Sequence, residues 1–235
     1  MDVVYVVGHG GTHEELRYSL RSLANIAHGN VWIVGHKPPW VGNVGHVPTP
    51  QHSTKWRNTT RAVYEACRSD EISATFSLWN DDFFALERTT IPNWHRGPVE
   101  PSRQALARPV RARRRRSHRD GQAATYDLLV RWGHERPLNY ELHVPMKIRS
   151  ELMLEVLDRS ASANIEVLHK RTLYGNVAKV GGRRHDDPKI TSLTATWSDR
   201  QRWVSTFDRS FADGKVGRHL RARFPDPSPY EVDHG

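Results

Sequence analysis

An apolar strand that leads through a glycine-rich turn into an amphipathic helix opens the chain, and this pattern constrains the fold most. Residues 2–7 are apolar and mostly β-branched after the aspartate, which is typical of a buried strand. Four apolar residues then recur on one helical face: Leu16, Leu20, Leu23 and Ala27. A second strand is expected at residues 31–34, and this order of elements makes the two strands parallel. The sequence therefore predicts an α/β fold, Rossmann-like, with a mostly parallel central sheet.

Capping and turn residues predict the boundaries of the remaining elements. We expect the first helix to start at Thr12, with Glu15 as its capping-box partner, and to end at Gly29. Gly and Pro make residues 35–50 a loop. A third strand is expected at residues 74–79 and a turn at Tyr174–Asn176. Further helices are expected at residues 55–67, 123–132 and 150–157, the last with Ser150 as N-cap, and around Val216, Leu220 and Phe224.

Positive charge is concentrated in one segment. The chain has 35 Lys and Arg against 26 Asp and Glu, a formal net charge of +9, and residues 101–119 hold eight Arg and no acid. Such a cluster can neutralise nucleic-acid phosphates, so a nucleic-acid-binding protein using residues 103–119 is one alternative function. However, no aromatic residue is interleaved for base stacking, and prolines flank the run. We therefore expect an irregular, Arg/Pro-rich insert at residues 87–122 and regard nucleic-acid binding as the less favoured reading.

Several protein classes are excluded or disfavoured. The single Cys67 excludes a disulfide framework and argues against a cysteine-based zinc site. No apolar run approaches the roughly 18 residues that span a bilayer, so we expect no membrane span and a cytoplasmic protein. Neither a Gly-x-Ser-x-Gly elbow nor a Gly-Lys-Ser/Thr loop is present, which argues against a serine hydrolase and a P-loop enzyme.

Two adjacent acids follow the predicted third strand. Asp81 and Asp82 come directly after Asn80, and ligands of open α/β sheets bind at the carboxyl ends of strands. Paired carboxylates suit Mg²⁺ or Mn²⁺, which commonly bridge to substrate phosphates, although such a pair can equally cap a helix. The turn containing Gly8 and Gly10 can cradle a phosphate through backbone N–H groups, or can be a simple tight turn.

Three more side chains are candidates for chemistry. His143 lies two residues before Pro145 and can act as a general base or contact a phosphate. Arg171 offers a guanidinium fork that suits a diphosphate, although most arginines are merely solvated. Asp208 stands in a stretch of mixed polarity and can be a third acid or a turn residue.

Short segments spread along the chain resemble one known family. In order they are Asp2–Tyr5, Glu15–Ser22, Asn80–Phe84, His143–Pro145, Phe207–Asp208 and Phe224–Glu231. Together they resemble the Stealth family of bacterial capsular-polysaccharide phosphotransferases, which is related to the animal enzyme that transfers N-acetylglucosamine-1-phosphate to lysosomal glycoproteins. The chain departs from the family pattern where Gly8-His9-Gly10 replaces an acidic Asp-Gly turn, and where Phe207 replaces an Asn before Asp208.

The resemblance implies a nucleotide-sugar-binding fold of the glycosyltransferase-A type, with a UDP-sugar or similar NDP-sugar as donor. It implies a Mg²⁺ or Mn²⁺ ion held by Asp81 and Asp82. Catalytic roles are implied for His143, Asp82, Arg171 and Asp208. Donor-binding roles are implied for Gly8, Gly10, Arg17 and Asn80.

We therefore expect one transferase domain over residues 1–235. It comprises a nucleotide-binding βαβ part at 1–86, the insert at 87–122, and a catalytic and acceptor part at 123–235. The expected reaction moves a sugar or a sugar-1-phosphate, with some preference for the latter, to a hydroxyl of a glycan or protein. A non-catalytic sugar-binding relative is a further alternative.

Overall fold

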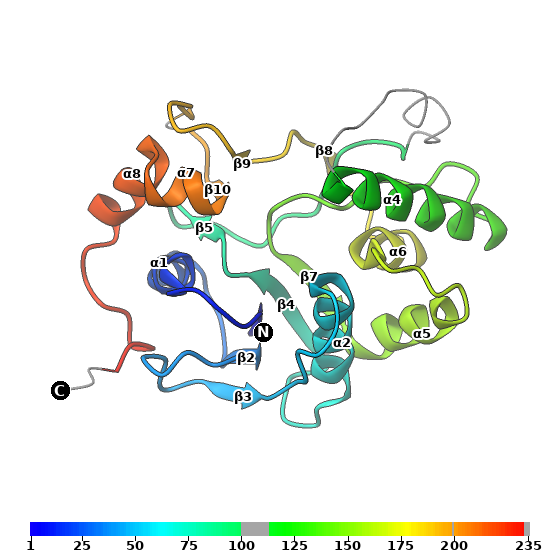
Figure 1. Cartoon of the computed structure of the whole chain (residues 1–235), viewed down its shortest axis with the longest axis horizontal. Helices are drawn as coiled ribbons and strands as arrows, with labels where there is room; N and C mark the ends of the chain where they lie inside the picture. The colour runs from blue at the N-terminus through cyan, green and yellow to red at the C-terminus, as the bar shows by residue number, and fades with distance from the viewer. Residues whose placement is uncertain (100–112, 199, 233–235) are drawn as a thin grey trace.

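A five-stranded, mostly parallel sheet forms the centre of the computed structural model, which describes residues 1–99, 113–198 and 200–232 (Figure 1). Its strands run in the order β3-β2-β1-β4-β7. They are β1 (Asp2–Val7), β2 (Val31–Gly35), β3 (Gly45–Val47), β4 (Thr75–Asn80) and β7 (Met146–Arg149). The first four are parallel, and β7 pairs antiparallel with β4. The expected α/β fold with a mostly parallel central sheet is confirmed.

Helices cover both faces of this sheet because the side chains of β1 alternate between them. Val3, Tyr5 and Val7 pack in one apolar cluster with α1 (Glu14–Ser22) and the 3-10 turn η1 (Leu23–Asn25). Val4 packs in the opposite cluster with α2 (Lys55–Arg68) and α5 (Ser150–Ala161). Since Val3, Val4 and Tyr5 are fully buried, β1 is a central strand with apolar neighbours on both sides.

Smaller units flank the sheet on two sides (Figure 1). On one side a three-stranded sheet, in the order β5-β10-β9, packs against two short helices. These elements are β5 (Phe83–Ala85), β9 (Lys189–Ile190), β10 (Trp203–Thr206), α7 (Asp208–Ala212) and α8 (Lys215–Arg223). On the other side lie α4 (Arg113–Arg131) and α6 (Lys170–Val177), together with the strand pair β6 (Trp94–His95) and β8 (Arg183–Arg184). Asp81 and Asp82 form the turn that joins the central sheet to the small one.

The start of the first helix differs from the prediction. Thr12 is not the N-cap, since α1 begins at Glu14 and is preceded by His13 in the left-handed region at φ 53°. Gly10 and Gly11 take positive φ values of 94° and 79°, and the turn extends one residue beyond Thr12, to His13. Glu15 therefore does not cap its own helix, and its carboxylate instead contacts the hydroxyl of Thr206 in β10.

Two segments predicted as irregular are helical. The insert was expected to be irregular up to residue 122, but α4 begins at Arg113, because Arg, Ala and Gln favour helix even when like charges adjoin. The part of the arginine run at residues 100–112 lies outside the described residues. The turn expected at Tyr174–Asn176 lies within α6. Gly175 is needed there because a Cβ would lie 2.4 Å from the ring of Tyr140.

Other boundaries agree more closely. Helix α2 and strands β2 and β4 lie within one or two residues of their predicted ends, and α8 ends at Arg223, ahead of the prolines. Short strands β3 and β7 appear where a loop or no element was expected. Ser150 is the first residue of α5 rather than its cap, which is Arg149. Within the described ranges, no helix is long and apolar enough to cross a membrane.

Candidate functional site

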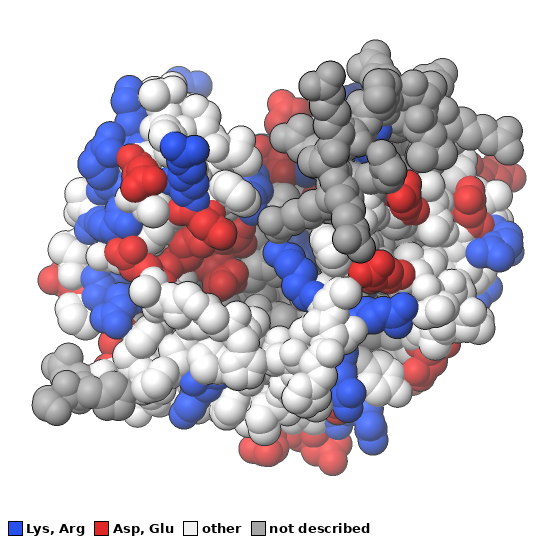
Figure 2. All heavy atoms as spheres, in the orientation of Figure 1, with Lys and Arg blue, Asp and Glu red and all other residues white. Residues whose placement is uncertain are grey.

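A cavity of about 240 Å³ lies at the carboxyl ends of the central strands. Val6 of β1 and Asn80 of β4 line it, together with Thr59 of α2 and Lys170 of α6. Figure 2 shows a hollow on this face of the molecule, with acidic side chains gathered on its left wall and basic side chains to its right. The parallel sheet thus presents its strand ends to a concave, charged region, which is where open α/β folds bind ligands.

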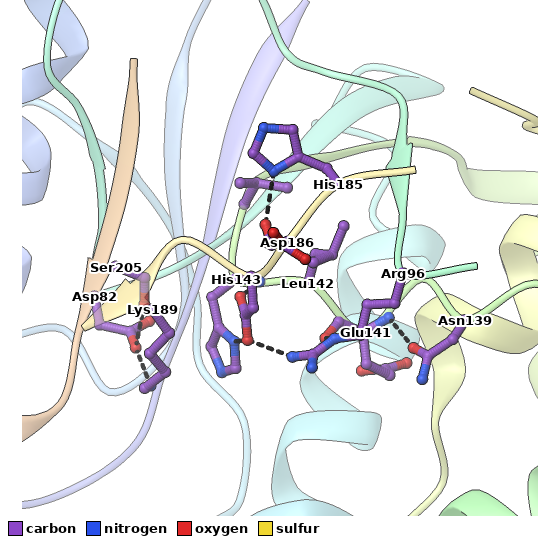
Figure 3. A network of polar contacts seen from close by, with 12 residues as sticks. Asp82, Arg96, Asn139, Glu141, Leu142, His143, His185, Asp186, Lys189 and Ser205 are labelled. Atoms are coloured by element: carbon purple, nitrogen blue, oxygen red, sulfur yellow. Dashed lines mark hydrogen bonds and ion pairs between the residues drawn. The ribbon is translucent and has the colours of Figure 1, made fainter. Parts of the chain in front are cut away.

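Asp82 is held rigidly at the acidic side. Its Oδ2 accepts hydrogen bonds from Lys189 Nζ at 2.7 Å and from Ser205 Oγ at 3.0 Å (Figure 3). Its Oδ1 is buried and has no hydrogen-bond partner among the described residues. One carboxylate oxygen is therefore fixed by the protein and the other is left as an unused acceptor.

Negative charges lie close together around Asp81 and Asp82. Burial, and next the charge of Asp82, hold the pKa of Asp81 well above its usual range. Burial likewise raises the pKa of Glu15 to about 7, against its hydrogen bond with Thr206, and the charges of Asp82, Asp81 and Asp208 add to the rise. A cation would relieve this repulsion.

The donor set fits a hard divalent cation only in part. Among the described residues, no three His, Cys, Asp or Glu side chains are arranged to hold an ion. Mg²⁺, however, is usually bound by one or two carboxylates while waters and substrate phosphates complete its shell. The unused Oδ1 of Asp82 and the neighbouring carboxylate of Asp81 fit that kind of site.

His143 forms a hydrogen-bonded dyad with Asp187, a residue that sequence reasoning missed. Its Nδ1 lies 2.8 Å from Asp187 Oδ2, and its backbone N–H donates to Asp187 Oδ1 at 3.0 Å. Arg96 pairs with the same carboxylate. Burial opposes ionisation of Asp187, but the hydrogen bonds from His143 and the charge of Arg96 hold its pKa below its usual range. An ionised carboxylate on Nδ1 fixes the ring so that Nε2 can take up a proton.

Arg171 is only 7% exposed, and its guanidinium donates hydrogen bonds to backbone carbonyl oxygens. Its Nη1 donates to the carbonyl oxygens of Leu142 and Val144, both at 2.7 Å, and its Nη2 donates to Leu78 at 3.2 Å. Three of its five N–H donors are thus used. The guanidinium ties the segment that carries His143 to strand β4, although Arg171 also lines the cavity.

We expect Arg171→Lys to destabilise the fold. A lysine ammonium cannot donate to three carbonyls in the same fork geometry, so buried acceptors lose their partners at a cost of about 2–4 kcal/mol. That corresponds to a melting temperature lower by roughly 2–4 °C per kcal/mol in a chain of this size. Thermal denaturation measures this effect. Arg183→Lys, at an exposed position of β8, is the matched control and should melt like the wild type. An unchanged melting temperature in Arg171→Lys would contradict the tethering role.

The other predicted donor-binding residues are dispersed. Asn80 lines the cavity. Gly8 and Gly10 lie exposed in the turn after β1 and do not line it. Arg17 pairs with Glu231 at 3.1 Å and lies over the ring of Trp40, so it secures the C-terminal segment instead.

Asp208, the third predicted acid, is exposed at the start of α7 and reaches the cluster only through its charge on Glu15. Of the predicted site residues, Asn80, His143 and Arg171 line the cavity, whereas Asp81 and Asp82 lie in the turn after β4 and do not line it. The structure adds Glu15, Lys170 and Asp187.

No known protein family and no curated protein sequence matches the chain.

Proposed function

We propose that the protein is a nucleotide-sugar-dependent transferase of the glycosyltransferase-A type, with an NDP-sugar as donor. The observation that carries the proposal is one juxtaposition at the carboxyl ends of the parallel strands. Asp82, tethered by Lys189, lies on one side of His143, and Arg96 with Glu141 lies on the other (Figure 3). An acidic end and a cationic end on either side of a base are what a diphosphate donor and a hydroxyl acceptor require.

Asp81 and Asp82 are the residues that would hold a Mg²⁺ or Mn²⁺ ion. When bound, such an ion neutralises the negative charge of the donor diphosphate. Lys189 occupies Asp82 Oδ2, so Oδ1 is the oxygen that would be available to such an ion. Asn80, at the end of β4, contributes a neutral amide beside the acidic pair.

His143 acts as the general base in this proposal. Its Nε2 makes no hydrogen bond to the described part of the chain, whereas its Nδ1 is held by Asp187. The acceptor hydroxyl gives its proton to Nε2 as the oxygen attacks the donor. Asp187 stabilises the imidazolium that results, and Arg171 keeps the backbone of this segment in place.

The nucleotide that is released distinguishes two reactions. Attack on the phosphorus attached to the sugar releases UMP, whereas attack on the anomeric carbon releases UDP. We expect UMP, because phosphoryl transfer needs positive charge around the transferred group, and Arg96 and Arg171 line the same cavity as His143. Chromatography of the products from UDP-sugars with a mixed panel of hydroxyl acceptors measures this outcome.

The same assay carries its own controls. Release of UDP alone would assign ordinary glycosyl transfer. No release from any nucleotide sugar, together with binding of the sugar, would leave a non-catalytic sugar-binding protein. His143→Gln should release nucleotide at least about 10²-fold more slowly, because the proton acceptor is removed.

A further inference from the structure

The cavity beyond His143 is cationic. Three basic side chains line it, Arg96, Lys170 and Arg171, together with His118 of α4. Glu141, the one acid among the described lining residues, keeps its negative charge, because neighbouring cations lower its pKa despite its burial, and its Oε1 accepts the backbone N–H of Thr172 in the first turn of α6. Arg96 is paired with Asp187, so Lys170 and Arg171 against Glu141 leave the lining with an excess of positive charge.

Lys170 is the least satisfied of these cations. Burial lowers its pKa to about 8, since the charge of Arg171 acts in the same direction and the charge of Glu141 only partly opposes it. No hydrogen bond joins its Nζ to any side chain or backbone group that the structure describes. A partly buried ammonium that makes no hydrogen bond to the protein is costly, and an anion in the cavity would stabilise it.

The size of the cavity limits the occupant. Pockets for drug-sized ligands measure roughly 300–1,000 Å³, and this cavity of about 240 Å³ is smaller. A cavity of this size fits one small polar unit, such as a single sugar, rather than an oligosaccharide. Gln122 and Asn139 in its wall offer amide groups that can bind hydroxyls.

We propose that this cavity holds the acceptor, and that the acceptor carries an anionic group, a phosphate or a carboxylate, near the hydroxyl that reacts. The inference rests on the proposed function, which places the donor at the acidic side of His143. A donor diphosphate needs a metal there because Asp81 and Asp82 would otherwise repel it. An acceptor in the cavity meets Lys170 with its anion and can present a hydroxyl to His143.

Calorimetric titration of the full chain tests the assignment with glucose 6-phosphate, glucuronate and glucose as probes. We expect both anions to bind and glucose to bind at least tenfold more weakly. Titration with UDP and Mn²⁺ present should leave the affinity for glucose 6-phosphate unchanged within twofold. Competition by UDP would assign the cavity to the donor and overturn the proposal, as would equal affinities for glucose and its phosphate.

Variants of Lys170 locate the anion. Lys170→Gln should weaken binding of glucose 6-phosphate at least tenfold, whereas Lys170→Arg should retain it. Lys147→Gln, an exposed position on β7, is the control and should bind like the wild type. Wild-type affinity in Lys170→Gln, with an unchanged melting temperature, would overturn the proposal.

Proton uptake gives a second readout. At pH 8.5 the wild type should take up protons as glucose 6-phosphate binds, because the anion favours the charged form of Lys170. The pKa of His118 is lowered by burial and that of Glu141 is lowered by neighbouring cations despite its burial, so neither group titrates near this pH. Arg171, the third group that faces Lys170, keeps its charge because a guanidinium does not lose its proton in a protein. Lys170→Arg should bind without this uptake, and uptake equal to that of the wild type would contradict the role of Lys170.

The binding measurement requires no turnover. Anion binding that depends on Lys170, combined with no nucleotide release from any NDP-sugar, would refute the transferase proposal and leave the anion site standing. Nucleotide release with neutral acceptors at rates equal to those with phosphorylated ones would refute the anion site and leave the transferase proposal standing.

Discussion

Asp81→Asn should raise the melting temperature at pH 8 and at the same time abolish turnover. In the wild type, burial and the charge of Asp82 raise the pKa of Asp81 above its value in the unfolded chain. Between the two pKa values the native state holds a proton that the unfolded state releases, so stability falls as pH rises through this window. Asparagine keeps the shape of the side chain and removes the buried negative charge that destabilises the native state at high pH.

The expected gain depends on pH. At pH 8 we expect Asp81→Asn to increase the free energy of unfolding by about 1–3 kcal/mol, which raises the melting temperature by roughly 2–4 °C per kcal/mol. Near pH 4 the difference should disappear, because Asp81 is protonated in the wild type. Added Mn²⁺ should stabilise the wild type and leave Asp81→Asn unchanged, since the variant lacks one of the two carboxylates that we propose as ligands. Scanning calorimetry at both pH values, with and without Mn²⁺, measures all three effects.

Asp158→Asn, at an exposed position of α5, is the matched control and should melt like the wild type under every condition. A variant that is both more stable and inactive would mark Asp81 as a residue retained for function. Wild-type turnover in Asp81→Asn, or turnover that EDTA leaves unchanged, would remove the metal from the mechanism.

The central sheet could be predicted because its signals are local. Strand β1 is an unbroken apolar run, and α2 has buried residues at helical spacing, Ala62, Val63 and Ala66. Strands β3 and β7 have three and four residues and lie at the two edges of the sheet. Segments that short carry too little periodicity to be distinguished from loops, and their strand geometry comes from pairing with β2 and β4.

The acidic pair and His143 could also be predicted as candidates, because each stands in a short distinctive segment. Asp187 could not, since it lies 44 residues beyond His143, and only the packing of the loop before β9 brings the two together. The role of Glu15 was misassigned for the same reason: its partner Thr206 comes from the other end of the chain.

Arg171 illustrates a different limit. Sequence identifies a guanidinium with five donors but not what accepts from them. The structure directs three donors to the carbonyls of Leu78, Leu142 and Val144, which makes the side chain a tether of the His143 segment. Its neighbour Lys170 was overlooked, because only burial beside Arg171 makes this lysine unusual.

The second large expected effect is a loss of kcat when either residue of the His143–Asp187 dyad is substituted. His143→Gln should lower kcat by about 10²–10⁴, the usual contribution of a general base, because glutamine cannot take up the acceptor proton. Asp187→Asn should lower kcat by about 10² or more and leave KM within a factor of two. An amide can orient the ring, but it carries no charge to stabilise the imidazolium, and it permits the wrong tautomer.

Asp186→Asn is the matched control for this comparison. Asp186 is the exposed neighbour of Asp187, and its side chain has no partner among the described residues, so kcat should not change. A merely structural role for Asp187 would instead lower the melting temperature and reduce kcat only in proportion to the fraction unfolded. Steady-state kinetics at a temperature where all variants are folded separates the two. Equal kcat values for Asp187→Asn and Asp186→Asn would show that the carboxylate on Nδ1 does not position the base, and His143 would then have to act without it.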